Sequence, residues 1–490
     1  MNCLPFYTLL SGMFLIFICA NEFKFLLTSL IIQTRTDHYL TGVLAFITLG
    51  LLGLTWPGVI SVDDFFLMDH LNTMNWIHTF SGSFYSGLMN LLLQLNGEVY
   101  FLNILQTVLY ISLFCKILYL INFLTTSESN KKRKLIKYFA LVFFVFPLNL
   151  SFVIFQNRDA LFSIFFGHMI FYIFLSLYDR TNAFSIKNKY FYFLLLCLFT
   201  LSLRQDAVFN LITVPFLLSL LKIVPLQTKW KHTALYITTA ILLSIPSLTQ
   251  SPDAQGYKIT TVVNPLSYII NKHGLGSLST EEIKGVEKVF RLDFLVRYYS
   301  PLEINPFHEG GLISTATSED FDKFYEICYS LFFRYKFDYL KNRVNVFLHG
   351  INLLETNYIW SDGLSKMNTT FNLENNYFLS PFRSQAVQLM SEITQSTSVI
   401  NWIPRILFFN IAPYFVVFLF FLFNFKNFKP EFIISSWIFF RLPILFFFEP
   451  ASIFKYYYSI YLCFIFLITH LYFRRVRAAD GFYESLTRSS

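Results

Sequence analysis

Long apolar segments recur along almost the whole chain, and they limit the possible folds more than any other feature. A helix needs about 20 apolar residues to cross a bilayer, and only helices or closed barrels satisfy their backbone groups there. A chain of 490 residues that is 55% hydrophobic and 14% charged has too much apolar surface for a soluble protein. We therefore expect an all-α polytopic membrane protein, with spans, some of them short, at 39–56, 99–123, 138–156, 160–178, 190–203, 206–224, 233–249, 403–425, 431–448 and 456–473.

The first apolar segment, residues 4–32, is less regular. It carries Asn21, Glu22 and Lys24 near its middle, where ionisable groups are costly in a membrane. An imperfect span or an interfacial helix is favoured over a signal peptide cleaved after Ala20, because no positive charge precedes the apolar run and Ile18 fits a cleavage site poorly. The expected total is about 10–11 transmembrane helices.

The loops between the spans alternate in charge, and this predicts the topology. Cytoplasmic loops are enriched in Lys and Arg, and every second loop here is basic: Arg35; Lys131–Lys134 with Lys137; Arg180, Lys187 and Lys189; Lys222, Lys229 and Lys231; Lys426 and Lys429; Arg474, Arg475 and Arg477. The first outer loop, 57–98, and a mostly helical soluble region, 250–402, would then lie on the opposite, outer face of the membrane. The transmembrane residues form an N-terminal part, 1–249, and a C-terminal part, 403–490.

Several functional classes have no support. The net charge of +8 sits in short loops, which indicates membrane topology rather than nucleic-acid binding. The cysteines form no CxxC pair or disulfide framework. The sequence has no Walker loop, GxGxxG, GxSxG or HExxH motif, so nucleotide-driven transport and the common hydrolase sites are not indicated.

The first outer loop holds the leading candidates for chemistry, Asp63 and Asp64. A carboxylate at the membrane surface can take a proton from a sugar hydroxyl, or the pair can bind Mg²⁺ or Mn²⁺ that neutralises a phosphate. The alternative is that they cap the interfacial helix predicted to follow them. His70 lies seven residues after Asp63 and so shares its helical face. His78 opens a stretch rich in aromatic and hydroxyl side chains, which suits contact with a sugar.

Cations and acids also occur at the outer ends of later spans. Arg is the preferred planar partner for phosphate, and ionisable groups at membrane depth are functional candidates. The alternative is that they only anchor helix ends at the interface. These residues are Arg158 with Asp159, Arg204 with Asp206, and Lys455 with Tyr456.

Several short motifs occur in a particular order: Pro57-Gly-Val-Ile-Ser-Val-Asp63, Arg158-Asp-Ala-Leu-Phe162, Arg204-Gln-Asp-Ala207, Leu278-Ser-Thr-Glu-Glu282 before Tyr298-Tyr-Ser-Pro301, and Phe454-Lys-Tyr-Tyr457. This order resembles that of the GT-C fold membrane glycosyltransferases, which use polyprenyl-phosphate-linked sugars. The closest likeness is to a bacterial branch that modifies O-antigen and other cell-envelope glycans, whose first outer loop reads Pro-Gly-x-x-Ser-x-Asp.

The chain departs from that pattern at two places. Phe80-Ser-Gly-Ser-Phe84 stands where Trp-His-Pro-Pro is expected, in a region implied to contact the acceptor. Lys455-Tyr456 replaces Arg-Tyr, which keeps the positive charge and loses the bidentate fork of a guanidinium.

The resemblance implies an inverting glycosyltransferase in a bacterial inner membrane, with its active site facing the periplasm. Asp63 would be the base or a metal-linked residue, with Asp64 beside it. The donor would be a hexose, such as glucose, on undecaprenyl phosphate, and the acceptor a lipid-linked or lipopolysaccharide glycan. Two alternatives stay open: a transporter or flippase of a lipid-linked saccharide, and an O-antigen polymerase.

Overall fold

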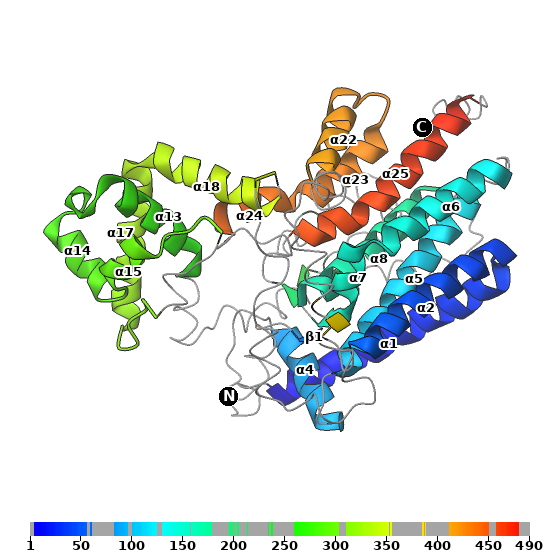
Figure 1. The fold of residues 1–490 in the computed structure, drawn as a ribbon, viewed down its shortest axis with the longest axis horizontal. Coiled ribbons are helices and arrows are strands. Elements are labelled where there is room, and N and C mark those ends of the chain that lie inside the picture. The colour runs from blue at the N-terminus through cyan, green and yellow to red at the C-terminus, as the bar shows by residue number, and fades with distance from the viewer. Residues whose placement is uncertain are drawn as a thin grey trace.

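The computed structural model describes residues 4–55, 59–60, 83–96, 100–124, 130–156, 158–178, 259–302, 310–351, 353–354, 411–449 and 457–479, with a few shorter stretches that include Leu203–Arg204. These residues are almost all helical. They form a helical bundle from both ends of the chain and a smaller helical unit from its middle (Figure 1).

The bundle begins with α1 (Leu4–Ile32), α2 (Arg35–Leu54), β1 (Val59–Ile60), α4 (Ser83–Asn96), α5 (Tyr100–Leu124), α6 (Asn130–Phe144), α7 (Pro147–Ile154), β2 (Phe155–Gln156) and α8 (Arg158–Tyr178). It is completed by α22 (Ala412–Phe423), α23 (Lys429–Phe439), α24 (Arg441–Phe448) and α25 (Tyr458–Ala479). The smaller unit consists of α13 (Thr260–His273), the 3₁₀ turn η2 (Leu275–Ser277), α14 (Thr280–Glu287), α15 (Leu292–Arg297), α17 (Ser318–Arg334) and α18 (Lys336–Gly350).

Four helical stretches are long and apolar enough to cross a membrane: Arg35–Leu54, Phe101–Leu124, Arg158–Leu175 and Glu431–Phe448. A fifth crossing is obtained if α6 and α7, which are bent by 53°, form one span. Pro147 begins α7, and because it has no backbone N–H and its ring displaces the preceding turn, the helix breaks there. The described part of the chain is thus that of an all-α membrane protein. The predicted spans at 206–224 and 233–249 lie almost entirely outside the described residues.

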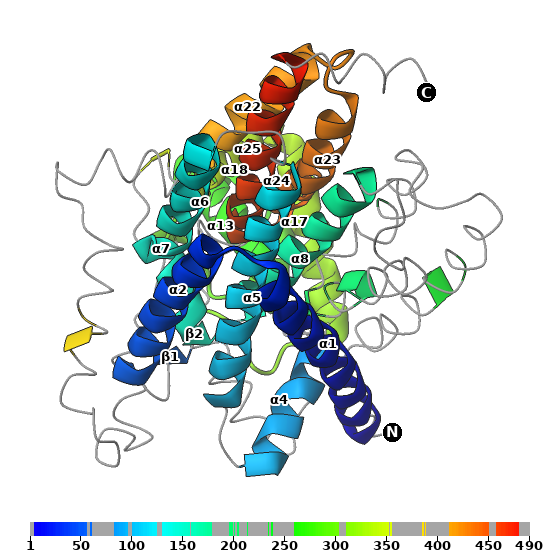
Figure 2. The same ribbon diagram turned by 90° about the vertical axis from the view of Figure 1, so that its right-hand side faces the viewer.

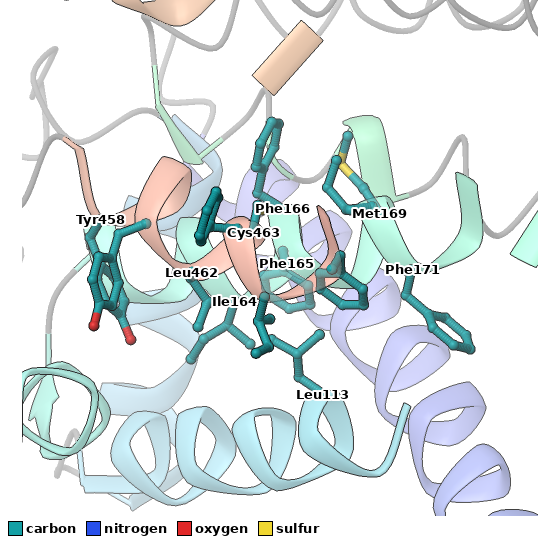
Figure 3. Close-up of a cluster of buried hydrophobic side chains, with 14 of the residues drawn as sticks. Leu113, Ile164, Phe165, Phe166, Met169, Phe171, Tyr458, Leu462 and Cys463 are labelled. Atoms are coloured by element: carbon teal, nitrogen blue, oxygen red, sulfur yellow. The ribbon is translucent and has the colours of Figure 1, made fainter. Parts of the chain in front are cut away.

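Helix α8 lies at the centre of the bundle. It packs between α5 and α25, and its buried side chains include Ile164, Phe165 and Phe166 (Figure 3). A Cβ at Gly167 would lie only 2.9 Å from Leu113 Cδ2 of α5, so glycine lets these two helices approach closely. Helices α1 and α2 diverge from their connecting turn, with α5 packed against both (Figure 2).

The end of the first outer loop forms α4, which packs along α1. The interfacial helix predicted to follow Asp63 and Asp64 lies outside the described residues.

The two ends of the bundle differ in their loops. The α1–α2 turn with Arg35, the start of α6 with Lys131–Lys134, and the end of α25 lie together, and we call this the basic end (Figure 1). The start of α8 and the strands β1 and β2 lie at the opposite end, the strand end, and the α13–α18 unit joins the bundle through α24. The described basic loops therefore gather as the sequence pattern predicts.

Capping boxes fix the starts of three helices. In α14, the Ser279 hydroxyl accepts a hydrogen bond from the Glu282 N–H while the Glu282 carboxylate accepts one from the Ser279 N–H. The same arrangement links Thr317 to Asp320 at α17 and Thr34 to Asp37 at α2. Glu282 also pairs with Arg334, whose hydrogen bond holds the pKa of the carboxyl below its ordinary value. The Leu278–Glu282 motif thus has a clear structural role.

Candidate functional site

The strand pair brings together the approaches to two motifs of the N-terminal part, Pro57–Asp63 and Arg158–Phe162. β1 and β2 are parallel, with Val59 opposite Phe155 and Ile60 opposite Gln156. β1 leads into the loop that holds Asp63 and Asp64, and β2 leads into Arg158 and Asp159. Parallel pairing means that both segments leave the strands in the same direction.

A buried glutamine positions this strand pair. Gln106 Nε2, on α5, donates hydrogen bonds to the carbonyl oxygens of Phe152 at 2.7 Å and Val153 at 3.0 Å. These are among the last carbonyls of α7, which have no partner further along their own helix. The amide therefore fixes the point where the chain leaves α7 and enters β2.

Asp159 forms a buried ion pair with Arg204. The acid lies in the first turn of α8, where the helix dipole favours negative charge. Its partner belongs to the second predicted motif, so the tertiary structure joins two motifs that the sequence keeps 45 positions apart. A carboxylate buried at this site needs a cation, because an unpaired buried charge is strongly destabilising.

A second arginine, Arg441, contacts α8 one helical turn after Asp159. The guanidinium carbon of Arg441 is 4.8 Å from the centre of the Phe162 ring, and Phe162 follows Asp159 by three residues on α8. Arg441 Nη1 donates a 2.9 Å hydrogen bond to Ser459 Oγ of α25, and the side chain is buried. The start of α24 thus adds a positive charge beside the starts of α8 and α25.

A third group of residues, centred on Arg343, joins the α13–α18 unit to the strand end of the bundle. Arg343 of α18 is buried and donates to the carbonyl oxygens of Phe446 at 2.7 Å and Glu449 at 2.8 Å. The Tyr457 hydroxyl donates to the Glu449 carboxylate. Glu449 and Tyr457 therefore bracket the segment that contains Lys455 and Tyr456.

The remaining predicted site residues lie outside the described residues: Asp63, Asp64, His70, His78, Asp206, Lys455 and Tyr456. Within the described part of the chain, no group of three or more His, Cys, Asp and Glu side chains could hold a metal ion. The structure thus brings together Asp159 and Arg204, and places the backbone leading to Asp63 beside that leading to Arg158.

One buried charged network was not predicted. Lys116 Nζ of α5 lies 2.6 Å from Glu22 Oε1 of α1 and 2.8 Å from His168 Nδ1 of α8. Ser112 Oγ donates to Glu22 Oε2 at 2.7 Å. All four side chains are buried, and by 1.5 Å per residue Glu22 lies about 15 Å from the end of α1 at Ile32.

The neighbours of this network indicate its protonation. His168 Nε2 is 3.1 Å from the Leu109 carbonyl oxygen, so this nitrogen carries the hydrogen and Nδ1 can accept from Lys116. The Lys116 ammonium lies 4.6 Å from the centre of the Tyr172 ring, a cation–π contact. Three ionisable residues inside otherwise apolar runs were the available signal in the sequence. Of the three, only Glu22 is part of the sequence-based predictions, as an irregularity of the first apolar segment.

A similar pair lies near the basic end, where His470 Nε2 of α25 is 2.6 Å from Glu431 Oε1 of α23. Lys137 of α6 also pairs with Asp37 of α2, at 2.6 Å. These contacts link the helices of the bundle to one another.

No protein-family model, curated protein or solved structure matches the chain.

Proposed function

We propose that this protein is a GT-C type glycosyltransferase that moves a hexose, such as glucose, from undecaprenyl phosphate to a periplasmic glycan such as O-antigen. One observation supports this most: β1 pairs with β2, so the chain entering the Asp63 loop lies beside the chain entering Arg158–Asp159. The strand end would face the periplasm and the basic end the cytoplasm of a bacterial inner membrane.

Asp63 is the proposed base. It follows Ile60 by three residues, and three residues of chain span at most about 10 Å, so a short path separates it from the β1–β2 pair. Its carboxylate takes the proton of an acceptor hydroxyl while that oxygen bonds to the anomeric carbon. The bond from this carbon to the phosphate oxygen breaks, and the lipid phosphate leaves with the electron pair, which inverts the configuration. Asp64 supports Asp63, or the two acids hold Mg²⁺ or Mn²⁺ near the phosphate.

The reaction also needs stabilisation of the departing phosphate, and the cations of the strand end supply it. Arg158, Arg204 and Lys455 are the proposed phosphate contacts, and Asp159 holds Arg204 in place through their buried ion pair. Arg441 adds a buried positive charge at the same end. His70, His78, Asp206 and Tyr456 are proposed to contact the sugar or the acceptor.

The test is transfer from defined hexose-linked undecaprenyl phosphates in membranes that contain the glycan acceptor, with the added residue detected by mass spectrometry. General-base catalysis contributes roughly 10²–10⁴-fold, so we expect Asp63→Asn to lose about that much activity. Asp69→Asn, in the same loop, is the matched control and should retain transfer. Normal transfer by Asp63→Ala would show that the base assignment is wrong.

A transporter or flippase of a lipid-linked saccharide is the second candidate. The observation that favours it is the Glu22–Lys116–His168 network, because a transport path needs polar groups within the membrane. The same assay separates the two candidates. A transporter moves the labelled lipid-linked sugar across sealed vesicles without forming a new glycosidic bond.

A further inference from the structure

An apolar stripe is exposed where α17 meets α18. Phe333, in the last turn of α17, is 82% exposed, and Phe337, in the first turn of α18, is 77% exposed. Leu340 and Val344 continue along α18 at 45% and 40%. Spacings of three and four residues place the three α18 side chains on one face. We call these four residues the α18 stripe.

The opposite face of α18 is held firmly, so the stripe cannot turn inward. Asn342 Nδ2 donates to Asn264 Oδ1 of α13 at 3.0 Å, and Asp338 pairs with Lys272 and His273 at the end of α13. Arg343 is anchored on the last carbonyls of α24. The two sets of contacts fix the rotation of α18 about its own axis.

The position of α18 in the molecule indicates what covers the stripe. Arg343 binds the carbonyls of Phe446 and Glu449, on either side of Phe447 and Phe448. Those two phenylalanines end the candidate span Glu431–Phe448 and are partly exposed, as expected of side chains that face lipid. Val344 directly follows Arg343, so this end of the stripe lies close to the place where α18 meets α24 at the strand end (Figure 1).

The flanking charges suit a bilayer surface. Lys336 and Lys341 lie on α18 beside the stripe and are exposed. A helix with Phe and Leu on one face and Lys beside them is typical of helices that lie in the interface of a membrane, and lysines there are attracted to anionic lipid headgroups.

We propose that α18 lies in the headgroup layer of the membrane at the strand end. Phe337, Leu340 and Val344 reach the boundary with the acyl chains, and Lys336 and Lys341 contact lipid phosphates. This contact would press the α13–α18 unit against the bilayer, which fixes its height above the membrane. The proposal does not depend on the reaction proposed above.

The experiment uses the full chain in lipid nanodiscs of phosphatidylethanolamine and phosphatidylglycerol. A nitroxide is attached at Phe337→Cys or Leu340→Cys, and its collisions with oxygen, which concentrates in lipid, are compared with those of a water-soluble nickel chelate. Glu287→Cys, on the exposed side of α14, is the control. The unaltered chain gives the labelling blank, and gel filtration confirms that each variant is folded.

We expect the ratio of oxygen to nickel collisions at both α18 positions to exceed that at Glu287→Cys several-fold. A ratio equal to the control would overturn the proposal, because the stripe would face water. Low collision rates with both reagents would also overturn it, since protein would then cover the stripe. Dipolar coupling between labels on separate chains would identify that cover as a second copy.

Discussion

At the scale of single residues, the buried charges of the bundle have the largest energetic consequences. Glu22, Lys116 and His168 come from three helices and meet at buried positions. A buried ion pair adds little to the free energy of unfolding compared with apolar residues of the same shape. Removal of one partner, however, leaves a buried charge without its counter-charge. The network therefore links α1 to α5 and α8.

Lys116→Met tests the contribution of this network to stability. The variant leaves Glu22 buried without its cation, so we expect a loss of about 3–5 kcal/mol in the free energy of unfolding, measured by denaturant titration in detergent. Lys24→Met, an exposed lysine on the same helix as Glu22, should change it little. The double variant Glu22→Gln with Lys116→Met should recover much of the loss. Equal effects of the two lysine substitutions would contradict the network.

At the scale of elements, the contact between α18 and the bundle depends on a glycine. A Cβ at Gly350 would lie 2.9 Å from Tyr457 Cε2 and 3.0 Å from Glu449 Oε1. Tyr457 and Glu449 are buried and hydrogen-bonded to each other, so neither can move aside cheaply. The absence of a side chain at Gly350 lets α18 approach the end of α24.

We therefore expect Gly350→Ala to cost about 1–3 kcal/mol, in the range of overpacked cores, and to increase proteolysis between the α13–α18 unit and the bundle. The control is Gly276→Ala, because nothing lies within 4 Å of a Cβ at that exposed position. The measurement is the midpoint of thermal unfolding together with limited proteolysis. A variant as stable and as protease-resistant as the control would show that the contact tolerates a side chain.

At the scale of the whole molecule, the two ends of the bundle differ in their loops and in attached structure. The basic end holds Lys131–Lys134, and the strand end carries the α13–α18 unit. The positive-inside rule then predicts that the basic end is cytoplasmic. The proposed reaction needs this orientation, because its acceptor is periplasmic.

Labelling with a membrane-impermeant maleimide tests the orientation. In cells with a permeabilised outer membrane, Glu287→Cys should react at once, whereas Lys132→Cys should react only after the inner membrane is broken. Both positions are exposed, so the difference reports the side of the membrane. The reverse pattern would place the α13–α18 unit in the cytoplasm and exclude a periplasmic acceptor.

Local sequence is enough to predict much of this fold. Apolar length indicates the spans of α2, α5 and α8, and capping residues such as Ser279 mark helix starts, because each depends only on neighbours within a few residues. The bend between α6 and α7 shows the limit. Residues 138–156 read as one apolar span, yet the helix breaks at Pro147, which hydropathy does not register.

The partners of the polar residues were decided only by the tertiary structure. The sequence indicated that Arg158, Asp159 and Arg204 mattered, but not that Asp159 pairs with Arg204, nor that β1 lies beside β2. Lys116 and His168 look like isolated exceptions in apolar runs until α1, α5 and α8 pack together. The reason is physical: apolar length and loop charge place a helix in the membrane, whereas side-chain packing between helices sets which faces meet and which charges share a site.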